Sequence, residues 1–150
     1  MTTFKNQDGF KNKVALITGA GSGIGQATAL ELARRGAVLW LTDINADNLE
    51  QTAQQVRALG ARCTTRICNV GSSTEMKKLA KAVHQQHPAL DILINNAGIG
   101  VAGRFVDTSL KTWNKVLDVN VKGVMLGCHL FAPNMIEQGS GHIVNLASAA

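Results

Sequence analysis

Short apolar runs rich in β-branched residues alternate with longer amphipathic stretches along the whole chain. The apolar runs predict five β-strands, which cover residues 14–18, 37–42, about 63–70, 91–95 and 142–147. Apolar residues at helical spacing predict helices over 24–35, 46–59 and about 74–86, and a long helix over about 110–136. Gly36 and Gly60 follow the first two helices and Ser109 precedes the long one, which are typical stop and start signals.

The order of these elements predicts the fold class. The strands are apolar nearly throughout, as expected when both faces of a parallel sheet are buried. Repeated strand–helix–strand units imply right-handed crossovers and therefore an α/β domain with a doubly wound parallel sheet. The chain shows no linker or internal repeat, so we expect residues 1–150 to form a single domain that begins with a polar segment at 1–12.

A glycine-rich turn, TGAGSGIG, joins the first strand to the first helix at residues 18–25. Gly19 permits a tight turn, Gly23 and Gly25 permit close backbone approach, and the start of the helix offers free N–H groups to a diphosphate. A P-loop would need Lys after its last glycine, and here Gln26 stands there. A hydrolase nucleophile elbow would need glycine two residues to either side of Ser22, and Ala20 and Ile24 occupy those places.

Asp43 ends the second strand, 18 residues beyond Gly25. An acidic residue at about this separation from the glycine turn is typical of a carboxylate that binds the adenosine ribose of a dinucleotide. The same carboxylate would repel the additional phosphate of NADP, by roughly 4 kcal/mol for charges about 4 Å apart at an effective dielectric constant of 20. The turn supplies no basic residue to offset this repulsion, because Ser22 stands at that position. The sequence therefore favours NAD over NADP.

Composition and charge narrow the function classes further. The chain has a net charge of +5 but only 4% aromatic residues, so it lacks the mixture of basic and aromatic residues that favours nucleic-acid binding. Its three cysteines lack metal-ligand spacing, and we expect no bound metal. Residues 1–12 have no apolar core typical of a signal peptide, and no apolar run reaches the roughly 20 residues that span a bilayer. We therefore expect a cytoplasmic protein with no membrane partner.

Four motifs together resemble the short-chain dehydrogenase/reductase family. They are TGAGSGIG at 18–25, NNAG at 95–98, VNVKG around Asn120 and IVNLAS at 143–148, and the resemblance extends from about Lys13 to Ala150. It implies a Rossmann fold, a nicotinamide cofactor, a small alcohol or carbonyl substrate, and oligomers formed through the long helix. The predicted class is thus an NAD-dependent oxidoreductase that acts on CH–OH groups.

The resemblance also implies roles for individual residues. Ser148 matches the serine that bonds the substrate oxygen, and Asn120 matches the asparagine that holds a water in the proton relay. The implied cofactor residues are the turn at Gly19, Ser22, Gly23, Ile24 and Gly25, the adenosine clamp at Asp43 and Ile44, the adenine contacts at Asn69 and Val70, and the turn at Asn96, Ala97 and Gly98. Many family members have Asp where this chain has Asn69. Two simpler interpretations stay open: Asn95 or Asn96 could merely tie strands together, and Asn120 could be a buried helix asparagine.

One part of the family pattern is missing from the chain. The family couples hydride transfer to proton transfer by a tyrosine and a lysine located downstream of the serine. This chain contains no tyrosine and ends two residues after Ser148. We therefore expect the 150-residue chain alone to be inactive, as the cofactor-binding part of an enzyme. The alternatives are a non-catalytic NAD-binding module and, less in keeping with the intact glycine turn, a basic interaction domain.

Overall fold

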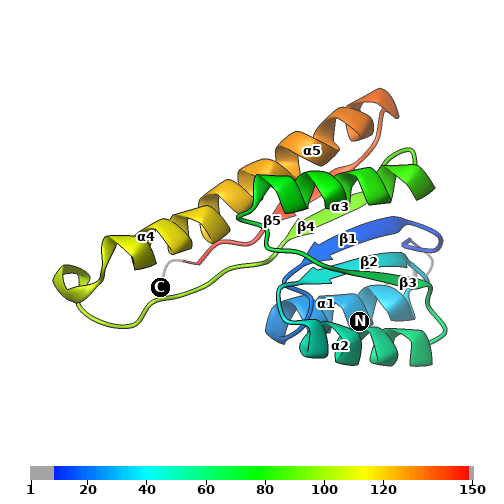
Figure 1. Ribbon diagram of the computed structural model, residues 1–150. Helices are drawn as coiled ribbons and strands as arrows, with labels where there is room; N and C mark the ends of the chain where they lie inside the picture. Colours follow the sequence, from blue (N-terminus) through cyan, green and yellow to red (C-terminus); the bar gives the residue numbers. More distant parts are fainter. Residues whose placement is uncertain (1–8, 149–150) are drawn as a thin grey trace, which may run out of the picture.

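A computed structural model describes residues 9–148 and shows one parallel sheet between two layers of helices (Figure 1). The strand order is β3-β2-β1-β4-β5, and every neighbouring pair is parallel. The strands are β1 (Val14–Thr18), β2 (Val38–Asp43), β3 (Cys63–Ile67), β4 (Ile92–Asn95) and β5 (His142–Asn145). This order confirms the predicted doubly wound α/β fold with five strands.

The helices divide between the two faces of the sheet. Helices α1 (Gly23–Arg34) and α2 (Ala46–Ala58) cover one face, and α3 (Ser73–Gln86) and α5 (Gly123–Glu137) cover the other (Figure 1). Alternate residues of the central strands supply a core to each layer: Ile17 and Leu41 pack toward the first pair of helices, whereas Leu16 and Trp40 pack toward the second. All four of these side chains are almost completely buried.

The outer strands differ from the prediction. The strands β1, β2 and β4 are nearly continuously buried, as expected, but β3 is only half-buried and β5 is largely exposed. Both are also shorter than the apolar runs suggested, since β3 ends at Ile67 and β5 ends at Asn145. The expectation that all strands are buried on both faces was therefore wrong for the two strands at the sheet edges.

The long predicted helix is built from three consecutive pieces. Helix α4 (Leu110–Leu117) continues through a π-helical segment, η2 (Asp118–Lys122), into α5. Ser109 caps the start, because its Oγ accepts a hydrogen bond of 3.2 Å from the Thr112 N–H. Helix α4 extends beyond the sheet and contains no buried residue, whereas α5 buries Phe131 completely (Figure 1).

The polar segment predicted at 1–12 lies mostly outside the described residues. Its described end contributes Phe10, whose ring lies 5.8 Å from the guanidinium carbon of Arg35 in a cation–π contact. Among residues 9–148, no helix is both long enough and apolar enough to cross a bilayer.

The outer edge of β5 generates the first prediction. Within residues 9–148 this strand pairs with β4 on one side only, and Val144 is 37% exposed beside an apolar groove. Because an open apolar edge invites pairing with another chain, we expect the 150-residue chain to aggregate, and the substitution Val144→Lys to reduce this aggregation. Light scattering on storage at concentrations on the order of tens of micromolar measures the effect.

The exposed Leu59 at the end of α2 offers a matched control, since Leu59→Lys adds the same charge away from both edges of the sheet. Equal suppression by both substitutions would show that added charge alone keeps the chain dispersed. A chain that stays monomeric without any substitution would contradict the prediction.

Candidate functional site

The sequence-predicted residues gather at the carboxyl edge of the sheet, where the strand order reverses between β1 and β4. Gly19 directly follows β1, and Asn96 directly follows β4. In doubly wound sheets this reversal opens the crevice in which ligands bind. The topology therefore brings the glycine turn and the NNAG segment side by side.

A group of hydrogen bonds joins the two strand ends. The Asn96 Nδ2 donates to the carbonyl oxygens of Thr18 (2.9 Å) and Gly19 (3.0 Å). In return, the Thr18 Oγ1 accepts from the N–H groups of Asn96 and Ala97, each at 3.0 Å. Asn96 thus does tie strands together, as the simpler interpretation proposed. Sequence analysis missed Thr18, although a hydroxyl at the end of a buried strand needs such partners.

The glycines of the turn are required by space as well as by conformation. Gly19 has a φ of +65°, and a Cβ there would lie 2.8 Å from the Cα of Ala97. A Cβ on Gly25 would overlap the carbonyl oxygen of Gly19. Helix α1 therefore packs directly against the turn that precedes it, and the Asn96 amide lies against the same position.

The start of α1 faces outward from this packed turn. The helix begins at Gly23, one residue before the predicted Ile24, and its N-cap residue Ser22 makes no side-chain capping hydrogen bond. Ser22 and Gly23 are exposed, and the Ile24 side chain is 66% exposed. A helix start of this kind presents free N–H groups and a partial positive charge, which favour an anion.

Asp43 lies beside the glycine turn and is hydrogen-bonded to it. Its Oδ2 accepts from the N–H of Gly21 at 2.8 Å, and its Oδ1 accepts from the N–H of Asn45 at 2.9 Å. The half-buried carboxylate is thereby fixed in position, while each oxygen keeps a lone pair for a further donor. The next residue, Ile44, is 67% exposed.

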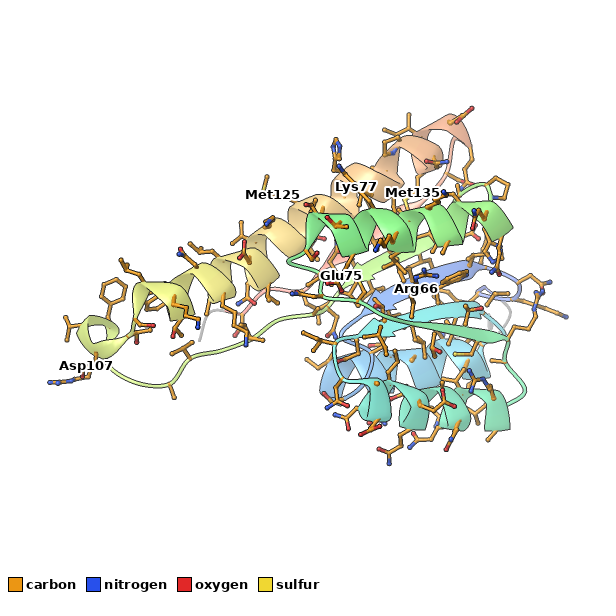
Figure 2. All side chains as sticks on the ribbon, viewed as in Figure 1. Arg66, Glu75, Lys77, Asp107, Met125 and Met135 are labelled. Carbon is orange, nitrogen blue, oxygen red and sulfur yellow. The ribbon has the colours of Figure 1, made fainter. Side chains whose placement is uncertain are left out.

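The loop after β3 contains Asn69 and Val70, which lie in different environments. Asn69 Oδ1 accepts a hydrogen bond from the Gly71 N–H at 3.0 Å, and its own N–H donates to Glu75 Oε2 at 2.8 Å. Figure 2 labels Glu75 at the start of α3. Val70 is only 6% exposed, and its side chain packs toward Gly123 of α5. Asn69 is therefore the more accessible of the two.

Asn120 lies in η2 and pairs with the backbone of one residue of the loop after β4. Its Oδ1 accepts from the Ile99 N–H, and its Nδ2 donates to the Ile99 carbonyl oxygen, both at 2.9 Å. Asn120 is exposed, so the interpretation that it is a buried helix asparagine was wrong. Its π-helical setting is one that often occurs at functional sites. Gly98 lies close to the same amide, since a Cβ there would be 3.6 Å from Asn120 Oδ1.

Ser148 lies three residues beyond β5, at the same edge of the sheet, and is exposed. The strand that delivers it is held by Asn95, which is 3% exposed and donates from Nδ2 to Asn145 Oδ1 at 2.8 Å. Cys128 of α5 contacts the same pair, with its Sγ 3.7 Å from Asn95 Nδ2 and 3.8 Å from Asn145 Oδ1. Asn95 therefore also ties strands together.

The described residues contain no group of His, Cys, Asp or Glu that could hold a metal ion. Burial raises the pKa of both Cys63 and Cys68 to about 11, so these two thiols stay protonated near neutral pH and are poor nucleophiles. What the site offers is a backbone turn with a helix start, one fixed carboxylate, and the polar groups of Asn120 and Ser148.

Sheet, strand order and glycine turn define a Rossmann-type domain, and comparison with known proteins identifies its family. Residues 13–150 match the family model described as short chain dehydrogenase. The chain therefore belongs to the short-chain dehydrogenase family of oxidoreductases. It is 41% identical over 142 residues to "Probable oxidoreductase EphD" of Mycobacterium tuberculosis strain H37Rv, covering 94% of this chain and 24% of that protein. It is 39% identical to cyclohexanol dehydrogenase of Acinetobacter sp. strain SE19, covering 94% of this chain and 57% of that one.

Solved structures agree with this assignment. A short-chain dehydrogenase/reductase from Burkholderia phymatum in complex with NAD superposes with a TM-score of 0.89 at 40% identity, over 93% of this chain and 50% of that one. A metagenomic short-chain oxidoreductase in complex with NADP superposes with a TM-score of 0.90 at 33% identity, over 94% and 64%. The chain thus spans between a quarter and two thirds of the length of these four relatives.

The Thr18 junction generates the second prediction. Thr18→Val keeps the shape of the side chain but removes the acceptor of the Ala97 N–H, whereas the Asn96 N–H keeps its second acceptor, the Ile94 carbonyl oxygen at 3.1 Å. An unsatisfied donor costs about 1–3 kcal/mol when it is buried, so we expect the free energy of unfolding of this variant to fall by about 1–2 kcal/mol in urea denaturation. Thr18→Ser retains the hydroxyl and is the matched control. Similar losses for the two variants would mean that packing, and not the hydrogen bonds, matters at this position.

Proposed function

We propose that this chain is the cofactor-binding part of an NAD-dependent oxidoreductase that interconverts an alcohol and a carbonyl compound. The observation that carries the proposal is the fixed carboxylate of Asp43, whose Oδ2 accepts a hydrogen bond of 2.8 Å from the Gly21 N–H inside the glycine turn. The glycine turn, which would bind the diphosphate, and the carboxylate, which would bind the ribose, are thereby held together.

The residues of the turn fit such a cofactor. The close packing of Gly19 against Ala97, and of Gly25 against Gly19, leaves the start of α1 open to a diphosphate. In this proposal the diphosphate contacts are Gly19, Ser22, Gly23, Ile24 and Gly25. Asp43 and Ile44 hold the adenosine ribose, Asn69 and Val70 the adenine, and Asn96, Ala97 and Gly98 form the turn beneath. NAD is favoured over NADP because the turn has no cation to offset Asp43.

The catalytic part of the proposal concerns Ser148 and Asn120. When bound, the nicotinamide would supply hydride chemistry. The Ser148 hydroxyl would donate a hydrogen bond to the substrate oxygen, and Asn120, held on Ile99, would use its remaining N–H or lone pair to hold a relay water. The proton itself needs a further acid–base group, because the chain contains no tyrosine.

A second candidate is a non-catalytic NAD-binding module, which would use the same glycine turn and carboxylate. Both candidates require the same cofactor contacts and both predict binding of NADH. They differ in turnover: only a longer protein that supplies the tyrosine and lysine of the family would oxidise or reduce a substrate. A cytoplasmic location stays a prediction from the sequence in either case.

We also propose that the chain forms homo-oligomers through the helix that runs from α4 to α5. Exposed apolar side chains follow one another along it at helical spacing, at Leu110, Leu117, Val121 and Met125. Figure 2 shows Met125 on the outer side of this helix, away from the sheet. An exposed apolar stripe of this length is characteristic of a protein–protein interface, and a second copy related by two-fold symmetry would cover it.

Cofactor binding provides the third prediction. We expect NADH to bind at least about tenfold more tightly than NADPH, since even part of a charge repulsion of roughly 4 kcal/mol changes affinity by that factor. Asp43→Asn removes the charge while keeping the shape, and should weaken NADH binding and reduce the preference. Isothermal titration with each nucleotide measures both effects, in the 150-residue chain that carries Val144→Lys to reduce aggregation.

Asp47→Asn is the matched control, because Asp47 is an exposed acidic residue in the first turn of α2 with no hydrogen bond to the glycine turn among those described. Its substitution should leave the preference unchanged. If NADPH bound the original chain as tightly as NADH, the assignment of NAD would be wrong. If neither bound, the whole proposal would fail.

Oligomer formation provides the fourth prediction. In a Val144→Lys background, which suppresses pairing at the β5 edge, we expect Leu117→Lys to shift the chain toward monomer by placing a charge in the apolar stripe. Sedimentation equilibrium measures the change. Lys111→Leu, on the same helix, would add an apolar residue and serves as the opposite control. An unchanged oligomeric state after Leu117→Lys would exclude this helix as the interface.

A further inference from the structure

The loop that follows β3 touches the long helix at two glycines where an added Cβ would be crowded. A Cβ on Gly71 would lie 3.1 Å from the carbonyl carbon, oxygen and Cβ of Asp118. A Cβ on Gly123 would lie 2.8 Å from Cγ2 and 3.1 Å from Cβ of Val70. Gly71, Gly123 and Val70 are all buried. Loop and helix are therefore in direct contact through two consecutive residues of the loop.

These two contacts lie at the two ends of η2. Asp118 is its first residue, and Gly123 directly follows its last. Asn120 lies between them and makes both of its hydrogen bonds, each 2.9 Å, to the backbone of Ile99. The position of Asn120 over Ile99 thus depends on where the loop holds the two ends of this segment.

We propose that Gly71 and Gly123 are positioning residues that couple the loop Asn69–Gly71 to Asn120. The proposal rests on the proposed function, in which Asn69 and Val70 contact the adenine of NAD and Asn120 serves the proton relay. Adenine binding at the loop then stabilises the hydrogen-bonded pair of Asn120 and Ile99. By thermodynamic linkage, an ordered η2 favours adenine binding to the same degree.

The loop is stiff enough to transmit this coupling. Asn69 is held at three points, since its N–H donates to Glu75, its Oδ1 accepts from Gly71, and its carbonyl oxygen accepts from the Ser72 N–H at 3.0 Å. Val70 has a β-branched side chain with little rotamer freedom. An atom added at Gly123 must therefore displace the helix or the loop, because the side chain between them cannot turn aside.

The experiment measures, by NMR, hydrogen exchange of the Ile99 amide, which donates to Asn120 Oδ1, with every variant made in the 150-residue chain that carries Val144→Lys to suppress pairing at the β5 edge. Gly123→Ala should lower the protection of this amide about tenfold, because the displaced helix opens the pair more often. Gly100→Ala is the matched control: a Cβ there would have no atom within 4 Å, so protection should stay unchanged. Asn120→Ala, which deletes the acceptor, sets the value for complete loss.

A compensating substitution tests the direction of the effect. Val70→Ala removes the Cγ2 that a Cβ at residue 123 would meet, so the double variant Gly123→Ala/Val70→Ala should regain most of the lost protection. Gly71→Ala tests the other contact independently and should also lower protection, which keeps the test decisive if Gly123→Ala alone does not fold. Full protection of Ile99 in both single glycine variants would overturn the proposal. Failure of the double variant to regain protection would also overturn it.

A second arm adds NADH. Saturating NADH should raise the protection of Ile99 in the original chain and in Gly100→Ala, and should raise it less in Gly123→Ala. Bound NADH that leaves Ile99 protection unchanged in the original chain would contradict the coupling while supporting the proposed function. If NADH does not bind at all, the proposed function fails, and the measurements without nucleotide still decide whether the two glycines position Asn120.

Discussion

The hydrogen-bonded junction between the ends of β1 and β4 is the constraint on which the rest of the site depends. Where β1 ends, the carbonyl groups of Thr18 and Gly19 would lose their sheet partners, and the Asn96 side chain replaces those partners at 2.9 and 3.0 Å. The Thr18 hydroxyl accepts hydrogen bonds from the N–H groups of Asn96 and Ala97, which follow β4. The chain can therefore leave the sheet abruptly at both strands and open a crevice without unsatisfied buried groups.

A second constraint is that the helices must approach the sheet more closely than side chains allow. Gly25 brings α1 against the turn, and Gly123 and Gly127, one helical turn apart, bring α5 against Val70 and the amide of Asn95. Gly127 has no space for a Cβ because the Asn95 Oδ1 lies there. The distance between this helix layer and the sheet is thus set by close contacts of the glycine backbone near the carboxyl end of the sheet. Asn120 and Ile99 form their hydrogen bonds at that same end.

The sequence predicted those features that depend on neighbours along the chain. The apolar runs of β1, β2 and β4, the glycine turn, and the acidic residue at the end of β2 all follow from local pattern. The lengths and the burial of the edge strands were not predicted. Strands β3 and β5 contain apolar residues, but the pairing of strands across the sheet decides which of them lie at its edges. Both are shorter and more exposed than expected.

Contacts between residues that lie far apart in the sequence could not be predicted from the local pattern either. The motif around Asn120 could be recognised, but its partner Ile99 lies 21 residues away, and Thr18 meets Asn96 across 78 residues. The repeated Asn95–Asn96 pair was the one hint of a strand junction, and nothing in its local pattern distinguished strand tying from ligand contact. Gly123 belongs to the VNVKG motif, but its contact with Val70, like that of Gly71 with Asp118, could be identified only in the structure.

Asp43 shows why cofactor preference and turn geometry are inseparable in this fold. Its two oxygens hold the backbone of Gly21 and Asn45, so the carboxylate orders both the glycine turn and the start of α2. A chain that exchanged this acid for an apolar residue to admit a further phosphate would also leave the part-buried Gly21 N–H without its acceptor, and Asn at this position would keep only one acceptor oxygen in place of two. Ser22 and Ile44 are under no such restriction, because Ser22 makes no capping bond and Ile44 is 67% exposed. A change of preference would therefore be easier to achieve by adding a cation at these exposed positions than by removing the acid.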